Sequence, residues 1–230
     1  MSLNPNWNKC ILFLVPDNVG KMRDYSPSGN HALQATAANQ PALSDKGVNT
    51  PLSLEFNGTV YPNSSYLQGA AFSSLDKTFF GIAMVSDFSS GLSNCIFMNN
   101  ISNTNRNIVT IYPDGTLRAS HYNGSYSEVS GSFDAGTFHT FSVSMTAGRA
   151  WTLFVDGEQY SGASAAGVDG SVGHYFIGIR DEHVTPAVCE AYKGNIQAFG
   201  AFDYVLSTDE HEQLHKYLLS FDLSHAKAIS

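Results

Sequence analysis

The stretch Phe138-His139-Thr140-Phe141-Ser142-Val143-Ser144-Met145, followed by Trp151-Thr152-Leu153-Phe154-Val155-Asp156-Gly157, decides the fold of this chain. In the first run His139, Phe141, Val143 and Met145 share one parity, and polar residues occupy the other. Successive side chains of a strand point to opposite faces, so one face can enter a core and the other meet water. Residues 146–149 supply a turn, and the pair Asp156-Gly157, which tolerates positive φ, ends the second run. The stretch therefore predicts a β-hairpin.

Short strand-like runs recur along the rest of the chain. Turn-rich segments separate them, and in the clearest turn, Tyr112-Pro113-Asp114-Gly115-Thr116, Pro pre-sets φ and Gly takes the left-handed position. A single helix is indicated late in the chain, where Ser207 and Glu210 form a capping box before a run with helical spacing. The strand-like runs are Cys10–Val15, Leu52–Phe56, Thr78–Val85, Cys95–Met98, Ile108–Tyr112, Thr116–Tyr122, Tyr175–Ile179 and Asn195–Phe202. The pattern predicts an all-β, antiparallel β-sandwich with one short C-terminal helix.

Length and composition favour one domain. All-β sandwiches commonly run to about 200–250 residues as one domain, and this chain has 230. Hydrophobic residues make up 43% of the chain, which suffices for a core, and only 14% of residues are charged. We expect a single domain over residues 1–222 and a C-terminal tail over residues 223–230, where the periodic pattern is lost.

Charge and hydropathy exclude two classes of partner. The net charge is −8, from 20 acidic against 12 basic residues, and Lys and Arg form no cluster, so a nucleic-acid backbone would be repelled. The most apolar early run, Cys10–Val15, is far shorter than the roughly 20 residues that a bilayer requires. Asn4, Pro5, Asn6 and Asn8 stand where a secretion signal would need a basic patch and an apolar run. We therefore expect cytoplasmic synthesis, with neither nucleic acid nor membrane as a partner.

Four segments spread over nearly the whole chain carry recognisable motifs. They are the loop Asp24-Tyr25-Ser26-Pro27-Ser28-Gly29-Asn30-His31, the strand and turn Leu54-Glu55-Phe56-Asn57-Gly58, the hairpin of residues 138–157, and the closing segment of residues 194–197 and 206–214. In this order they resemble the concanavalin A-like lectin/glucanase superfamily, and specifically its laminin G-like jelly-roll domains, with Pro27 inserted relative to the commonest form of the first loop. The resemblance implies a jelly-roll sandwich.

The resemblance also raises the question of calcium, because related domains carry rim sites built from loop carboxylates and carbonyls. Asp24 and Asp181 are the candidates here, against the alternative that Asp24 forms an Asx turn with Ser26 and Asp181 ends a strand. Calcium takes about 6–8 oxygen ligands, and Gln197 replaces the acid usual in the family. We favour the alternative, expect no cofactor, and leave a metal site open. Cys10, Cys95 and Cys189 are odd in number and widely spaced, which predicts reduced, buried thiols.

Signatures of catalysis are weak in this sequence. Enzymes of this superfamily that cut β-glucans place paired carboxylates on one strand face, whereas Asp181 and Glu182 are adjacent and Asp209 and Glu210 begin the predicted helix. His211 and His215, at helical spacing, favour a surface or partly packed pair over a zinc site, and no Gly-x-Ser-x-Gly elbow occurs. We expect a non-catalytic module, with a glycan-cleaving enzyme whose carboxylates come from separate strands as the alternative.

Eleven tyrosines, several in polar surroundings, indicate the ligand class. A tyrosine offers a flat apolar face with a hydrogen-bonding tip, which suits stacking on a sugar ring. Tyr61 and Tyr66 are two of these residues, but the densest group surrounds one predicted hairpin. The candidate carbohydrate-binding residues are Tyr112, His121, Tyr122, Asn123 and Tyr126. The alternative is that these aromatic residues pack in the core.

The N-terminal Asn4-Pro5-Asn6-Trp7 and the loop of residues 24–31 are also similar to laminin G-like proteins of bacteriophage virions. The resemblance implies a tail or capsid-decoration protein at a virion surface, with a glycan or cell-surface polysaccharide, capsid or tail proteins, or a second copy of the chain as partners. A purely architectural virion protein without lectin activity is the further alternative.

Overall fold

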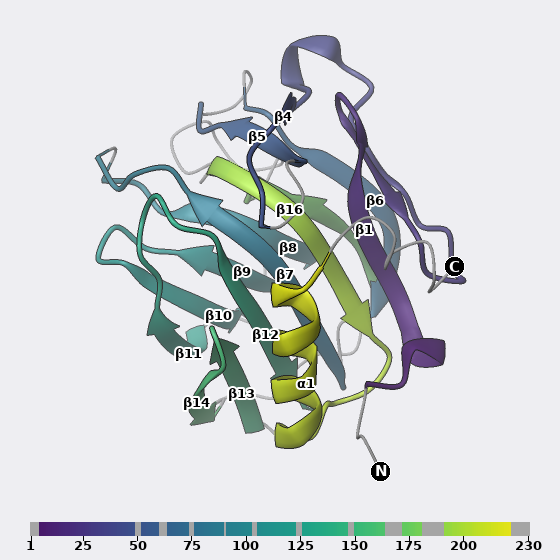
Figure 1. Cartoon of the computed structure of the whole chain (residues 1–230), viewed down its shortest axis with the longest axis vertical. Helices are drawn as coiled ribbons and strands as arrows, with labels where there is room; N and C mark the ends of the chain where they lie inside the picture. The colour runs from purple at the N-terminus through teal and green to yellow at the C-terminus, as the bar shows by residue number, and fades with distance from the viewer. Residues whose placement is uncertain are drawn as a thin grey trace.

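The computed structural model describes residues 5–48, 52–59, 64–73, 76–89, 91–102, 105–122, 126–146, 150–163, 172–180 and 191–221. In these ranges the chain is built mainly of β-strands, with one α-helix near the C-terminus (Figure 1). The elements are η1 (Trp7–Lys9), β1 (Cys10–Asn18), β2 (Lys21–Asp24), β3 (Ala32–Leu33), η2 (Ala37–Asn39), β4 (Ala42–Ser44), β5 (Ser53–Asn57), β6 (Leu67–Ser73), β7 (Lys77–Val85), β8 (Asn94–Ser102), β9 (Asn105–Ile111), β10 (Thr116–Tyr122), β11 (Tyr126–Ser132), β12 (His139–Met145), β13 (Ala150–Val155), β14 (Glu158–Ala163), β15 (Val172–Ile177), β16 (Lys193–Phe202) and α1 (Thr208–Leu219).

The described strands form one hydrogen-bonded path that folds over into two layers. Its order is β11-β10-β9-β8-β15-β6-β3-β2-β1-β16-β7-β12-β13-β14, and β4 and β5 pair beside β16. The two ends of the path meet, because Gly131 on β11 lies against the ring of Tyr160 on β14. Every pairing between the described strands is antiparallel. The prediction of an antiparallel sandwich with one C-terminal helix is confirmed.

The main core lies between the two layers. Phe97 on β8 stacks on Phe199 on β16 with 4.7 Å between ring centroids, and Phe79 on β7 lies 4.8 Å from Phe97. All three rings are fully buried, so they join the layer of β6, β15 and β8–β11 to the layer of β1, β16, β7 and β12–β14. Cys10 and Cys95 are buried as expected, and burial raises the pKa of Cys10 to about 12, so its thiol stays protonated. Cys189 lies outside the described residues.

The predicted hairpin is present as β12 and β13, with Phe141 opposite Val155 and Met145 opposite Trp151. Asp156 and Gly157 both have positive φ, 51° and 87°, so this pair makes the turn into β14. The turn expected at residues 146–149 falls largely outside the described residues.

One expectation for this hairpin is wrong. The polar face of β12 does not meet water, because Thr140, Ser142 and Ser144 are all buried. Helix α1 covers them, as Figure 1 shows, and His211 on the helix hydrogen-bonds Ser142 Oγ through Nδ1 at 2.7 Å and Ser144 Oγ through Nε2 at 2.8 Å. Of the two alternatives for the helical histidines, a surface pair or a partly packed pair, the packed one holds: His211 is fully buried, and His215 is half-buried and bonds Thr140 Oγ1.

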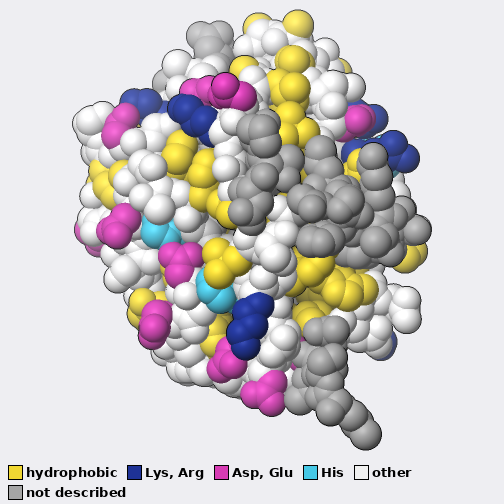
Figure 2. All heavy atoms as spheres, viewed as in Figure 1, with side chains coloured by type: hydrophobic (Ala, Val, Ile, Leu, Met, Phe, Trp, Pro, Cys, Tyr) yellow, Lys and Arg dark blue, Asp and Glu magenta, His cyan; other side chains and the backbone are white. Residues whose placement is uncertain are grey.

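Helix α1 begins where the sequence predicts. Ser207 caps it: the backbone N–H of Glu210 donates to Ser207 Oγ, and the backbone N–H of Ser207 donates to the Glu210 carboxylate. Leu214 and Leu218 face a second apolar cluster against the outside of β1, β7 and β16, where Phe13 and Phe80 are buried. On the molecular face that carries α1, Lys and Arg side chains are scattered among acidic ones (Figure 2).

The predicted strands are all present, with shifts of one to several residues at their ends, but β2, β3, β4, β6, β11 and β14 were not predicted. The last two are polar, YSEVSGS and EQYSGA, and lie at the ends of the path, where β-branched apolar residues are not required. Among the described residues no helix is long and apolar enough to cross a membrane.

Candidate functional site

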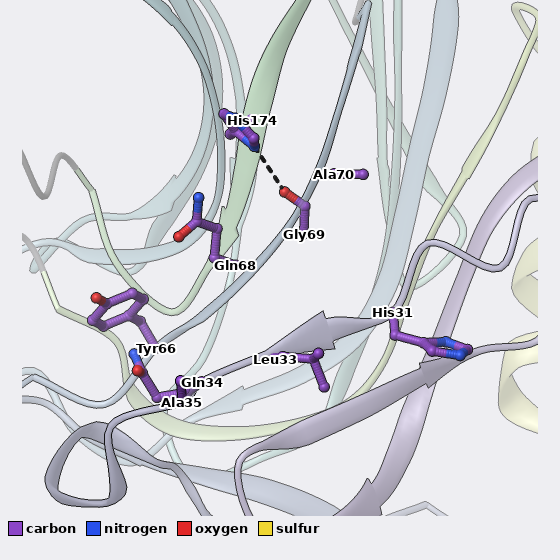
Figure 3. A pocket seen from close by; sticks show the side chains of 9 residues that line it. All are labelled: His31, Leu33, Gln34, Ala35, Tyr66, Gln68, Gly69, Ala70 and His174. Atoms are coloured by element: carbon purple, nitrogen blue, oxygen red, sulfur yellow. Dashed lines mark hydrogen bonds between the residues drawn. The ribbon is translucent and has the colours of Figure 1, made fainter.

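A hollow of about 390 Å³ lies on the outer face of the sandwich, over β3, β6 and β15 (Figure 3). We call it the Tyr66 pocket. Its described lining residues combine one aromatic ring, two histidines and two glutamines with small or apolar side chains. They are His31, Leu33, Gln34, Ala35, Tyr66, Gln68, Gly69, Ala70 and His174.

Strand alternation places these side chains on the outer face. On β6 Leu67 is fully buried in the main core, and the next residue, Gln68, is half-buried on the other face. On β15 Tyr175 points into the core, and His174 is exposed. Gln68 pairs with Leu33 on β3 and with Phe176 on β15, so the three strands place side chains from distant parts of the sequence next to one another.

Gly69 allows a close approach beneath this pocket. A Cβ at this position would overlap the ring of Tyr175. The Tyr175 hydroxyl donates to the carbonyl oxygen of Asn30 at 2.6 Å, and burial raises its pKa above the ordinary value, so it remains a donor. This hydrogen bond fixes the loop that carries His31 against the floor of the pocket.

Asp24 organises the same loop. Its Oδ1 accepts from the backbone N–H groups of Phe13 and Ser26 at 2.8 Å each, and its Oδ2 accepts from Ser26 Oγ at 2.9 Å and from Asn30 N at 2.6 Å. The Asx turn with Ser26 is therefore confirmed. Since both oxygens are engaged by these donors and the side chain is buried, Asp24 does not fit the role of a calcium ligand.

The other residues of the calcium hypothesis are Asp181 and Gln197. Asp181 lies outside the described residues, and the described residues contain no group of three or more His, Cys, Asp or Glu side chains that could hold a metal. Gln197 is buried and pairs with both peptide groups of Val48: its Oε1 accepts from Val48 N at 2.7 Å and its Nε2 donates to Val48 O at 2.8 Å. A carboxylate could not donate the second bond, which gives the amide at this position a structural reason.

The hydrogen-bonding roles of the pocket histidines follow from their partners. The backbone N–H of Asp24 donates to His31 Nδ1 at 3.0 Å, so a neutral His31 carries its proton on Nε2 and can donate from there. His174 Nδ1 lies 3.2 Å from the carbonyl oxygen of Gly69, to which it must donate, so a neutral His174 accepts through Nε2. The pocket therefore has a donor on one imidazole and an acceptor on the other.

Tyr66 is positioned by a backbone hydrogen bond and by packing of its side chain. Its backbone N–H donates to the carbonyl of Asn39 at 3.1 Å. The half-buried side chain packs against a small cluster in the middle of the outer face that includes Met98, Ile108 and Phe176. In Figure 3 the side chains of Tyr66 and Gln34 lie close together, and His31 lies at the opposite end beyond Leu33.

The tyrosine group predicted from the sequence lies elsewhere, on the hairpin of β9 and β10. The guanidinium of Arg118 lies 4.0 Å from the centroid of the Tyr112 ring and covers one of its faces. His121 is fully buried, with Nδ1 2.9 Å from Asn107 Oδ1, because its strand position faces the core. It has no exposed surface for a sugar, so its inclusion among the binding residues is wrong.

The remaining members of that group are placed only through the backbone. Tyr122 on β10 pairs with Arg106 on β9 and with Tyr126 on β11. The side chains of Tyr122 and Tyr126, and the whole of Asn123, lie outside what the structure describes. For these three residues the carbohydrate-binding role stays a prediction.

Sequence reasoning singled out Tyr66 for its polar surroundings but missed Gln34, Gln68 and His174. Gln34 directly follows the two-residue strand β3, and Gln68 and His174 lie on β6 and β15, so only the pairing of β3 with β6 and of β6 with β15 brings them together. The one local signal was the motif of residues 24–31, which ends in His31.

Comparison with known proteins identifies the fold. No family model matches the chain, and no curated protein matches its sequence. Trypanosoma rangeli sialidase in complex with sialic acid superposes with a TM-score of 0.67 at 14% identity, over 91% of this chain and 33% of the sialidase. The likeness shows the fold alone.

Toxin domains give a similar result. The receptor-binding domain of botulinum neurotoxin type G superposes with a TM-score of 0.67 at 13% identity, over 90% of this chain and 51% of that domain. For the binding domain of serotype C1 the TM-score is 0.65 at 12% identity, over 93% of this chain and 53% of that one. The chain thus spans about a third of the sialidase and about half of the toxin domains.

Proposed function

We propose that this chain is a non-catalytic carbohydrate-binding module and that its sugar site is the Tyr66 pocket. The observation that carries the proposal is the combination of a fixed tyrosine ring with amide and imidazole groups around one hollow. Sugar sites need these two features, because an aromatic face covers the apolar face of the ring and polar side chains bond its hydroxyls. Two kinds of structural neighbour, a sialidase crystallised with sialic acid and receptor-binding domains of toxins, support a ligand of this class.

A glycan array followed by calorimetry with the best ligand tests the proposal. Tyr66→Ala should weaken binding by about tenfold or more, the usual effect of removing a central aromatic contact. Tyr112→Ala serves as the matched control and also tests the hairpin site predicted from sequence. If Tyr112→Ala abolishes binding and Tyr66→Ala does not, the site is on the hairpin and the pocket is not the binding site.

The enzymatic alternative requires carboxylates from outside the described lining of the pocket, which contains none. Incubation with a polysaccharide panel and measurement of new reducing or unsaturated ends tests it. Release of such ends by purified protein would replace the binding-module proposal with an enzyme.

For biological context we propose a bacteriophage virion protein, at a tail or capsid surface, and this rests on the sequence resemblance. Co-purification with phage particles, or virion genes beside its own, would support this placement. Tight association with a capsid or tail protein together with a blank glycan array would favour a purely architectural role. Among the described strands β4 pairs only with β5, so its other edge offers a route to a homo-oligomer, which light scattering of the purified chain would detect.

A further inference from the structure

The Tyr66 pocket places an exposed apolar side chain beside an amide. Leu33 is 51% exposed on the outer face of the sheet. Its cross-strand partner is Gln68, so the two side chains start about 5 Å apart on the same face of the sheet. Ala35 and Ala70, which also line the pocket and are exposed, extend this apolar surface. These side chains offer apolar contact to a methyl group.

A second amide is fixed in one orientation. Oε1 of Gln34 accepts from the backbone N–H of Thr36 at 2.9 Å, so the Nε2 group takes the opposite position as a donor. The backbone of Gln34 is anchored on both sides, because its N–H donates to Gly20 O at 2.9 Å and its carbonyl accepts from Gln40 Nε2 at 2.8 Å. Gln34 is only 8% exposed, so little side-chain freedom remains to be lost when a ligand binds.

Acceptors complete the pocket. The amide oxygen of Gln68 and Nε2 of a neutral His174 can both accept a hydrogen bond from a ligand N–H or O–H. The pocket therefore offers a donor, acceptors and a methyl-sized apolar surface within one hollow lined by the Tyr66 ring.

An acetamido group is complementary to this combination of a donor, an acceptor and an apolar surface. Its carbonyl needs a donor, its N–H needs an acceptor, and its methyl group is stabilised by leaving water. A hydroxyl in the same place would leave Leu33 exposed to solvent. We infer that the sugar bound in the Tyr66 pocket carries an acetamido group, as in N-acetylglucosamine or N-acetylgalactosamine, an inference that rests on the proposed function.

Calorimetry with two matched pairs of methyl glycosides tests this inference: N-acetylglucosamine against glucose, and N-acetylgalactosamine against galactose. One added hydrogen bond and one buried methyl group predict that the acetamido member of at least one pair binds about twentyfold tighter. If both members of each pair bind equally, the inference is wrong and glycan binding stands. If no sugar binds here or on a glycan array, the proposed function fails together with the inference.

Two variants assign the preference to the residues named. Leu33→Ser should reduce the ratio of the two affinities to about fivefold, because the hydrogen bond remains, and Gln68→Ala should reduce it to about fourfold, because the methyl contact remains. Leu43→Ser and Gln159→Ala, at exposed positions on β4 and β14, are the matched controls and should keep the full ratio. Partial unfolding lowers both affinities alike and leaves the ratio intact, so a ratio unchanged in both pocket variants would overturn the inference.

Discussion

Helix α1 is fixed to the sheet by a titratable side chain, and its replacement should change how stability depends on pH. His211 lies between Ser142 and Ser144, and its ring stacks on Phe154 with 4.6 Å between centroids. Burial lowers the pKa of His211 from its ordinary value of 6.5 to about 4, against the opposing charge of Glu210. The informative variant is His211→Gln, which keeps an amide for one serine and cannot titrate.

The magnitude follows from proton linkage. Each pKa unit is worth about 1.4 kcal/mol, so the fall from 6.5 to about 4 corresponds to about 3 kcal/mol. Above pH 6.5 neither state binds the proton and this stability is fully present. As the pH falls from 6.5 towards 4 the unfolded chain is protonated first, so folded stability is lost in that window. Below about pH 4 both states are protonated and the dependence on this group ends.

Neighbouring groups act in separable ways. Burial lowers the pKa of His215, so His215 contributes in the same direction as His211. Burial opposes the charged form of His139, but its hydrogen bond with Asp156 outweighs this effect and raises its pKa. His139 therefore stabilises the fold fully below pH 6.5, and this stability is lost only as the pH rises through the raised pKa. The pKa of Glu210 is lowered by its bonds to Ser207 against the effect of burial, so its contribution is lost only in acid. The pH-dependent contributions of these three residues are the same in wild type and variant, so they cancel in the comparison.

Urea denaturation at pH 7.5, 5.5 and 4.5, followed by circular dichroism, measures the difference. Between pH 7.5 and 4.5 the wild type should lose about 2–3 kcal/mol more than His211→Gln. At pH 7.5 the variant should be less stable by about 1–2 kcal/mol, because one serine loses its partner. Gln213→Ala, on the same helix, is the control and should show the wild-type pH dependence. An identical dependence in wild type and His211→Gln would refute the buried, neutral state of His211.

Three further substitutions probe the scaffold around the site by thermal denaturation. Gln197→Glu should cost about 3 kcal/mol, because a buried carboxylate would face the carbonyl oxygen of Val48; a stability equal to wild type would show that this amide pairing is absent. Gly69→Ala should cost about 2 kcal/mol or more, since the new Cβ would displace the Tyr175 ring, and a neutral effect would contradict the close approach under the pocket. Ser207→Ala should cost about 1 kcal/mol through loss of the capping box, and a loss below a few tenths would mean that the cap contributes little.

The scaffold could be predicted from the sequence because core packing requires apolar residues at a regular spacing along each strand. The alternation of Phe141, Val143 and Met145 exists because these residues enter the core, and Ser207 with Glu210 marks the start of a helix through contacts three residues apart. The burial of Ser142 could not be predicted in this way. Its polar parity is the same whether water or His211 faces it, and the helix that covers it is 69 residues away in the sequence.

The Tyr66 pocket could not be predicted from local sequence patterns for a related reason. Leu33 belongs to a strand of two residues, too short for any periodicity, and its partner Gln68 lies on a strand of small and polar residues. The hypothesis of a carbohydrate site on the β9–β10 hairpin also assumed that tyrosine and histidine side chains are exposed because of their residue type. Arg118 covers one face of Tyr112, and strand parity turns His121 inward, and neither effect is visible without the pairing of β9 with β10.

Amide chemical-shift mapping by NMR tests directly whether sugar binds over β3, β6 and β15. During titration with N-acetylglucosamine or the best glycan from an array, the account predicts saturable shifts that cluster at residues 31–35, 66–70 and 174. Shifts that cluster instead on the hairpin of residues 112–122, or the absence of any saturable shift, would contradict it.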